Sequence, residues 1–224
     1  TSGSTGPVTV TATTGTTGPT DYPTVKDAFD AVNAGTHTGV VTVSVVANTT
    51  ETGPAILNGS GAGSASYTAL TVRAGADGVS VSGPTTTGRG LIELNGADNV
   101  TIDGDNPGTA GTNRNLTFTN TAANTITFTS VIRVALNITT VNSADNNIFR
   151  NLNIVGSSPG RNIVAATSTT ASENTTFGIF VGPNASAPTT APTAITSVLT
   201  GVAAGATAAN LIVENNNVVT AARA

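Results

Sequence analysis

A recurring phrase constrains the fold of this chain more than any other feature: a short apolar strand that carries asparagine and ends in a turn. The phrase occurs at 99–104, 114–120, 148–155 and 212–219. The last two copies align without a gap, Asn151 with Asn215 and Asn153 with Asn217. A strand-and-turn unit that recurs irregularly is typical of a solenoid, in which each turn of the chain buries its apolar side against the next.

The composition indicates an all-β protein. Thr and Val, which favour strands, are abundant, while Gly, Asn, Ser and Pro supply turns. With 38% hydrophobic residues among 224, the chain is apolar enough to fold around a core. Short strands are expected at 7–13, 40–46, 55–57, 69–73, 79–82, 91–94, 100–102, 116–119, 131–136, 148–155, 177–181 and 211–219.

The residue types that the chain lacks exclude several classes of site. Without cysteine there is no disulfide framework, thiolate metal site or cysteine nucleophile. The absence of Cys and Met also removes the main targets of oxidation, which suits an extracellular or cell-surface protein. The first residues, Thr-Ser-Gly-Ser-Thr-Gly, are expected to be a mature end left after removal of a signal. A net charge of −4 argues against nucleic acid as a partner, and no apolar run has membrane-spanning length.

One amphipathic helix is expected at 22–34, after an N-terminal arm over 1–20. Thr24 can accept a hydrogen bond at the start of this helix, with Asp27 three residues later as a variant capping box. A single apolar stripe follows, formed by Val25, Ala28, Phe29 and Val32. Because the first turn of a solenoid exposes its apolar interior, we expect this helix to cap it.

Asparagine inside the repeated strands favours a parallel solenoid over a β-sandwich, which also has many short strands. Stacked asparagine side chains can hydrogen-bond from one turn of the chain to the next. The members of this structural repeat are Asn99, Asn115, Asn151, Asn153, Asn215 and Asn217. Two stretches rich in Ser, Thr, Ala and Pro, 158–175 and 183–207, depart from the pattern, and we expect them to be inserted loops that project from the side.

The stretch Asp-Tyr-Pro-Thr-Val-Lys-Asp-Ala-Phe-Asp-Ala-Val at 21–32 resembles the opening of pectin-lyase-like right-handed parallel β-helix proteins. The segments 92–104 and 114–120 are similar to β-helix regions of large secreted bacterial surface proteins. The resemblance implies a right-handed parallel β-helix with an N-terminal strand and a short capping α-helix. We expect a single domain over 1–224, with its coils at 40–220. The scaffold hosts lyases, esterases, hydrolases, adhesins and passive stalks, so it says little about function.

One cluster of carboxylates in the sequence could support catalysis or metal binding. It consists of Asp98, Asp103 and Asp105, and Arg114 follows shortly after. Clustered oxygens suit a calcium ion or acid–base chemistry. The run 103–108 is also typical of turns, and we favour that interpretation because no basic pair stands nearby. The lone histidine, His37, is expected to be a solvated loop side chain. We therefore expect neither enzyme activity nor a cofactor.

Three functions stay open. We favour a non-catalytic structural or adhesive surface protein that assembles with itself head-to-tail into a filament. The expected contacts are the last coil at 211–219, after which no cap is visible, and an exchanged strand within 1–13. The second function is a polysaccharide-binding or polysaccharide-degrading module with surface glycans as partners. The third is the N-terminal piece of a longer adhesin.

Overall fold

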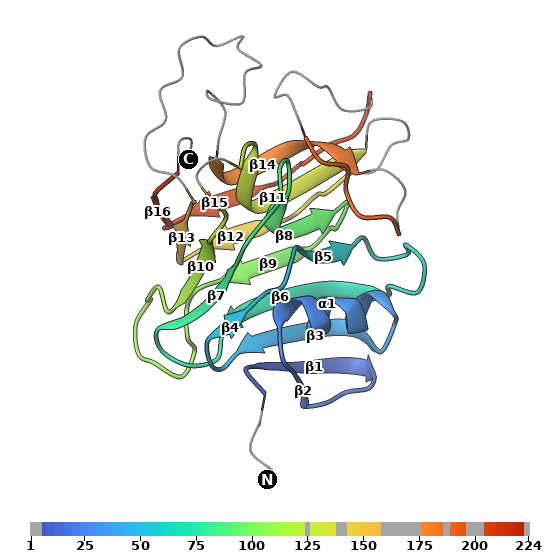
Figure 1. Ribbon diagram of the computed structural model, residues 1–224. Coiled ribbons are helices and arrows are strands. Elements are labelled where there is room, and N and C mark those ends of the chain that lie inside the picture. Colours follow the sequence, from blue (N-terminus) through green and yellow to red (C-terminus); the bar gives the residue numbers. More distant parts are fainter. Residues whose placement is uncertain are drawn as a thin grey trace.

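The computed structural model describes residues 6–123, 126–137, 143–157, 176–185, 189–195 and 204–221. In these residues the fold is all-β, as expected: three sheets with one short helix beside them (Figure 1). The first three strands belong to one sheet; from the third strand onward, successive strands enter successive sheets, so the chain visits the three sheets in turn and then returns to the first. Each such pass is called a round below.

The first sheet, sheet A, has seven strands. Its strands from the second round onward pair in parallel with the strand of the round before. In spatial order they are β15 (Ile212–Glu214), β12 (Ile148–Arg150), β9 (Val100–Asp103), β6 (Tyr67–Ala74), β3 (His37–Val45), β1 (Val8–Gly15) and β2 (Thr20–Tyr22).

The other two sheets are parallel throughout. Sheet B consists of β16 (Asn217–Val219), β13 (Leu152–Val155), β10 (Leu116–Asn120), β7 (Val79–Gly83) and β4 (Thr49–Thr50). Sheet C consists of β14 (Thr176–Ala185), β11 (Thr129–Asn137), β8 (Gly90–Asn95) and β5 (Ala55–Asn58). Parallel strands need crossover connections, and here the strands of the other two sheets supply them.

Helix α1 (Val25–Asn33) is shorter than the expected 22–34, and its four apolar stripe residues have no exposed surface. Asp27 N–H donates to Thr24 Oγ1 at 3.0 Å, which caps the helix. A second cap comes from outside the helix. The Glu51 carboxylate accepts from the backbone N–H groups of Val25 at 3.0 Å and Lys26 at 2.9 Å. The helix start is thereby fixed to the first round.

The N-terminal strand lies within the first sheet. β1 pairs antiparallel with β2 on one edge and with β3 on the other. Both edges of β1 are therefore occupied within the chain, and the strand expected to be free for exchange is paired internally from Val8 onward. In Figure 1 the β1–β2 pair lies at the bottom of the stack of strands and β14, β15 and β16 lie at its top.

The repeated phrase at 148–155 is two strands rather than one, and so is its copy at 211–219. Asn151 lies between β12 and β13 with a φ of 57°, and Asn215 lies between β15 and β16 with a φ of 50°. This left-handed backbone turns the chain from sheet A to sheet B. The sequence-based prediction of continuous strands was wrong here because period and composition do not reveal a corner of one or two residues.

The structure describes part of one of the two expected inserted loops, 183–207, and none of the other. Residues 158–175 lie outside the described residues. Of the stretch 183–207, the first residues belong to β14, which extends to Ala185. Residues 189–195 do not project from the side, since they lie against β8 and β11, as described below.

Candidate interaction surface at the open edge

Columns of inward-facing apolar side chains run up each sheet, one residue per strand. In sheet A the column contains Val43, Val72, Ile102, Phe149 and Val213, aligned by the strand register. Its first four members are at most 1% exposed, whereas Val213 is 50% exposed. Burial of each side chain depends on the round above it, and in the part of the chain that the structure describes no round lies above Val213.

Sheets B and C end in the same way. In sheet C, Val134 is fully buried beside Val181, which is 38% exposed. In sheet B, buried Ile154 aligns with Val218, which is half-buried. Within the described residues, no strand pairs with the outer side of β14, β15 or β16. We call the surface of these three strands the open edge. It contains a concavity of about 400 Å³ lined by Ile179, Val181, Leu211, Val213, Glu214, Asn215, Asn216 and Val218.

Outward-facing charges alternate across sheet A. Arg73 on β6 aligns with Asp103 on β9, Asp103 with Arg150 on β12, and Arg150 with Glu214 on β15. The Arg150 guanidinium donates from Nε to Asp103 Oδ2 at 2.7 Å. Opposite charges directly across neighbouring strands stabilise a sheet, and like charges destabilise it. This column also ends at the open edge, on the exposed carboxylate of Glu214.

Asparagines stack at the corner between sheets A and B. Asn151 Nδ2 donates to Asp103 Oδ1 at 2.8 Å, and Asn215 Nδ2 donates to Asn151 Oδ1 at 2.7 Å. A carboxylate only accepts, so Asp103 forces Asn151 to present its NH₂ group downward and its oxygen upward. Asn215 must therefore donate in turn. The carboxylate at the base sets the direction of the whole ladder.

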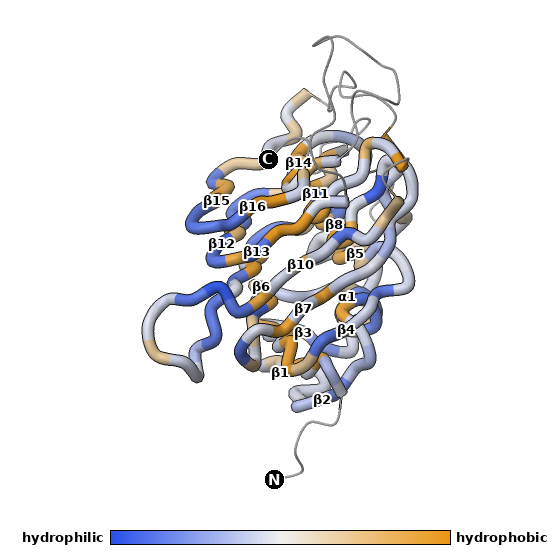
Figure 2. The backbone as a smooth tube through the Cα atoms, turned by 60° about the vertical axis from the view of Figure 1, so that its left-hand side comes forward, coloured by the Kyte–Doolittle hydropathy of each residue, from blue (hydrophilic) through white to orange (hydrophobic). Residues whose placement is uncertain are grey.

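A parallel ladder stands on the outer face of sheet B. Asn153 Nδ2 donates to the backbone oxygen of Arg114 at 3.0 Å, and Asn217 Nδ2 donates to Asn153 Oδ1 at 3.3 Å. Figure 2 shows hydrophilic turns stacked beside β12 and β15 next to hydrophobic strands. The backbone oxygen fixes the amide direction here as the carboxylate does in the other ladder.

Two of the expected asparagines behave differently. Asn99 belongs to a third ladder, in which Asn146 donates to Asn99 at 3.3 Å and Asn210 donates to Asn146 at 2.9 Å. Sequence reasoning missed Asn146 and Asn210, although they are separated by the same 64 residues as Asn151 and Asn215. Asn115 instead binds a loop: it accepts from Gly78 N–H at 3.1 Å and donates to Asp77 at 2.7 Å.

Of the three candidate carboxylates, Asp103 and Asp105 line one small hollow with Thr71, Arg73 and Pro107, whereas Asp98 lines a different one. Asp98 accepts from the Asp145 N–H at 2.6 Å, and burial, with the Asp145 charge nearby, raises its pKa. Asp103 accepts from the Asp105 N–H at 2.9 Å, and Asp105 accepts from the Asn113 N–H at 2.8 Å. No group of metal-ligating side chains gathers among the residues that the structure describes. Asp103 therefore supports a turn and an asparagine ladder, and Asp105 supports a turn.

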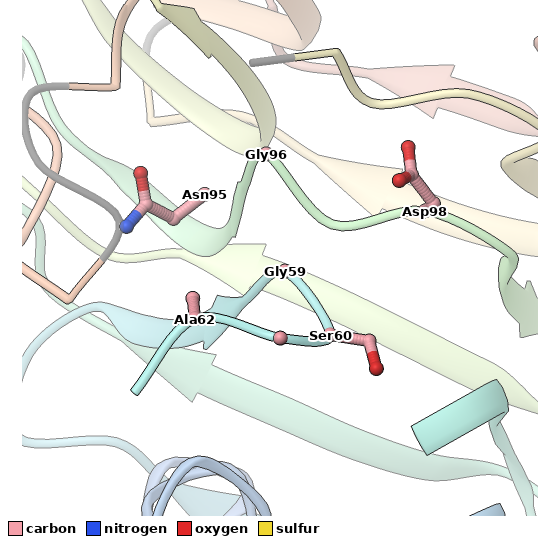
Figure 3. A pocket seen from close by; sticks show the side chains of 7 residues that line it. Gly59, Ser60, Ala62, Asn95, Gly96 and Asp98 are labelled. Atoms are coloured by element: carbon pink, nitrogen blue, oxygen red, sulfur yellow. The ribbon is translucent and has the colours of Figure 1, made fainter. Parts of the chain in front are cut away.

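A small hollow beside Asp98 is lined by Gly59, Ser60, Gly61, Ala62, Asn95, Gly96 and Asp98, with a volume of about 200 Å³ (Figure 3). The labelled polar side chains, Ser60, Asn95 and Asp98, point away from one another in Figure 3. A binding site needs polar groups that converge on the ligand. This hollow lacks that arrangement, so the open edge is the better candidate site.

His37 is not the solvated side chain that was expected. It is the first residue of β3 and is fully buried. Its Nδ1 lies 2.5 Å from the Thr16 backbone oxygen, and its Nε2 lies 2.7 Å from the Tyr22 hydroxyl. Because a carbonyl only accepts, Nδ1–H donates to it, and in the neutral imidazole the Tyr22 hydroxyl then donates to Nε2. The histidine fixes β2 and the preceding turn to β3.

Sequence reasoning missed a buried charged pair on the outer face of sheet C. Glu93 and Arg133 are both fully buried, and Arg133 Nη1 lies 3.3 Å from Glu93 Oε1. Burial lowers the pKa of Arg133, and Glu93 opposes that shift. The signal was a charge inside an apolar strand, as in Leu-Ile-Glu-Leu at 91–94.

Residues 189–195, which we call the strap, cover this pair. Arg133 Nη2 donates to the backbone oxygens of Thr193 at 2.7 Å and Pro183 at 2.9 Å. Asn95 Nδ2 donates to the Thr190 oxygen at 3.1 Å. The strap removes the pair from water while supplying acceptors that the guanidinium needs, as a buried charge requires.

Comparison with protein-family models, with curated proteins and with solved structures gives no match. Among the described residues, no helix is both long and apolar enough to cross a membrane.

Proposed function

We propose that this is a non-catalytic structural or adhesive protein of the extracellular surface, and that it assembles through the open edge. In this proposal the three sheets are the faces of a right-handed parallel β-helix of the pectin-lyase-like class. The order of strands supports it, because each round adds one strand to each sheet in the same sequence.

The observation that carries the proposal is the abrupt change of exposure along the inward columns. Phe149 and Val134 are fully buried. Their neighbours in the next strand are not: Val213 is 50% exposed and Val181 is 38% exposed. Burying such side chains is worth about 1–2 kcal/mol each. Among the described strands none pairs with the outer edges of β15 and β16, and these edges add a template for further strands.

A head-to-tail filament is compatible with the strand directions. β2 is antiparallel to β1, and β1 is antiparallel to β3, so β2 runs in the same direction as β3 and β15. A second copy stacked in the same orientation would therefore present β2 parallel to β15. A contact of this kind does not close on itself and generates fibres.

The test is the state of assembly of the purified protein over a range of concentrations. Sedimentation velocity and electron microscopy should show concentration-dependent oligomers or filaments for the wild type. Val213→Asp should abolish them by placing a charge on the open edge. Val40→Asp is the matched control, because Val40 is 49% exposed but lies on β3, away from this edge. A wild type that stays monomeric at high concentration, or a Val213→Asp variant that assembles normally, would contradict the proposal.

A further inference from the structure

We propose that the open edge selects its partner by charge: the strand that pairs with β15 comes from another polypeptide and carries a cation, Arg or Lys, in the register of Glu214. This inference rests on the proposal that the open edge is an assembly surface. It adds which strand the surface accepts.

The charge column of sheet A indicates that the partner strand carries a cation. From Arg73 through Asp103 and Arg150 to Glu214 the sign alternates at every strand, and the strand register places these residues directly opposite one another. An acid at the register of Glu214 would break the alternation by setting two carboxylates side by side. A cation continues it, as Arg150 does above Asp103.

The direction of the asparagine ladders indicates that the partner strand also carries side-chain NH₂ groups. Asn217 and Asn210 each donate their NH₂ group to the rung below. Their side-chain oxygens therefore face away from the round below, on the side of the open edge. Among the described residues no donor reaches either oxygen. A following strand that presents side-chain NH₂ groups at these registers would extend both ladders. Asparagine near the cation is thus the second mark of the partner.

The chain itself contains a segment with this chemistry. Residues 146–155 read Asn-Asn-Ile-Phe-Arg-Asn-Leu-Asn-Ile-Val, with Arg150 beside asparagines. The segment pairs with β9 and β10 in the way inferred for the partner at the open edge. The filament contact, β2 of a second copy against β15, would bring Asp21 to this register, because Asp21 lies in the same column as Arg73. We therefore expect that contact to be weaker than the contact with a basic strand of a different chain.

The experiment uses two labelled synthetic peptides and the intact protein. One peptide has the sequence of residues 146–155, and the other is identical except that Glu replaces the arginine corresponding to Arg150. Fluorescence anisotropy should show that the arginine peptide binds about five-fold more tightly at low salt, the range of a cross-strand charge pair. The difference should shrink in 1 M NaCl. Val213→Asp should abolish the binding of both peptides.

Because the protein is acidic overall, a basic peptide could bind without specificity, and two variants address this. Glu214→Arg should reverse the preference, so that the glutamate peptide binds better. Asp30→Arg makes the same change in net charge on the exposed face of α1, where Asp30 pairs with Lys26. It should leave the preference for the arginine peptide in place. Circular dichroism would verify that both variants are folded.

Each outcome decides the inference. Equal affinity for the two peptides, binding of neither, or a preference that Glu214→Arg leaves unchanged would overturn it. If the wild type assembles in a manner sensitive to Val213→Asp while the peptides bind equally, the assembly surface stands and the charge rule falls. A reversed preference without self-assembly would support the charge rule and rule out the homopolymer.

Discussion

Asn215 donates a side-chain hydrogen bond to Asn151 at 2.7 Å, and both residues have left-handed backbones, with φ values of 50° and 57°. Asparagine suits both roles, because it tolerates this backbone region better than most residues and its amide donates and accepts at once. One residue type therefore turns the chain between sheets and bonds successive rounds to each other. This pairing explains why asparagine recurs where an apolar strand would otherwise continue.

Replacing Asn151 should separate these two contributions. Asn151→Ala should lower the free energy of unfolding by about 2–3 kcal/mol, since alanine pays for the left-handed backbone and both side-chain hydrogen bonds are lost. Asn151→Gly should cost about 1 kcal/mol less, because glycine accepts the backbone freely. Asn153→Ala, which removes a ladder rung from within strand β13, serves as control and should cost under about 1 kcal/mol. Urea denaturation measures all three. Equal losses for Ala and Gly at position 151 would refute the backbone requirement.

Asp103 should make stability depend on pH in the acid range. Partial burial alone would raise its pKa, but hydrogen bonds from Asn151, the Asp105 N–H and Arg150, with the charge of Arg150, outweigh burial and lower it. A lowered folded pKa contributes stability that is present above the usual value of 3.8 and is lost as pH falls through the folded value.

Asp103→Asn should remove that dependence. At pH 7 the free energy of unfolding of the variant should be about 1–2 kcal/mol lower than that of the wild type. The loss is modest because the Arg150 side chain is 41% exposed and water screens its charge pair with Asp103. The difference in the free energy of unfolding between wild type and variant should narrow below pH 3.8. Unfolding midpoints in urea at a series of pH values provide the measurement, and a gap that stays constant down to pH 2 would argue against the assignment.

Glu51 should have the opposite pH dependence. Burial raises its pKa, against the lowering effect of hydrogen bonds from the Lys26 and Val25 N–H groups. A raised folded pKa contributes stability that is fully present below the usual value of 4.5 and is lost as pH rises through the folded value. Glu51→Gln should abolish this slope while keeping an acceptor for the helix. Glu51→Ala should cost about 2 kcal/mol, because it leaves backbone donors at the helix start unpaired. Parallel slopes for wild type and Glu51→Gln between pH 4 and 6 would contradict this.

Several parts of the fold could be predicted from sequence because they rest on local patterns. The stripe that contains Val25 and Phe29 follows the helical period, and its burial needs no knowledge of other elements. The gapless alignment of Ile148 with Ile212 and of Asn153 with Asn217 reproduces the register of the parallel pairs. The alignment works because stacked rounds place equivalent residues side by side.

The remaining features depend on contacts between distant residues. The Glu51 cap joins residues separated by 26 positions, and the Arg133 contact to Thr193 joins residues separated by 60. Single-sequence periodicity carries no information on such pairs. The open edge was expected from the final copy of the phrase. Its charge column appeared only when Arg73 and Asp103, which lie in unlike sequence contexts, were aligned by the sheet register.

The strap should come away from sheet C when its main donor is removed. Arg133→Met deletes the donors to the Thr193 and Pro183 oxygens and leaves Glu93 with one fewer partner, so stability should fall by about 3–5 kcal/mol. Limited proteolysis followed by mass spectrometry should show new cleavage within 189–195. The milder Arg133→Lys keeps the charge without the planar fork and should give intermediate cleavage if the first variant fails to fold. Arg150→Met, on the outer face of sheet A, should leave the strap protected. A folded Arg133 variant whose strap resists cleavage as the wild type does would show that the guanidinium does not hold it.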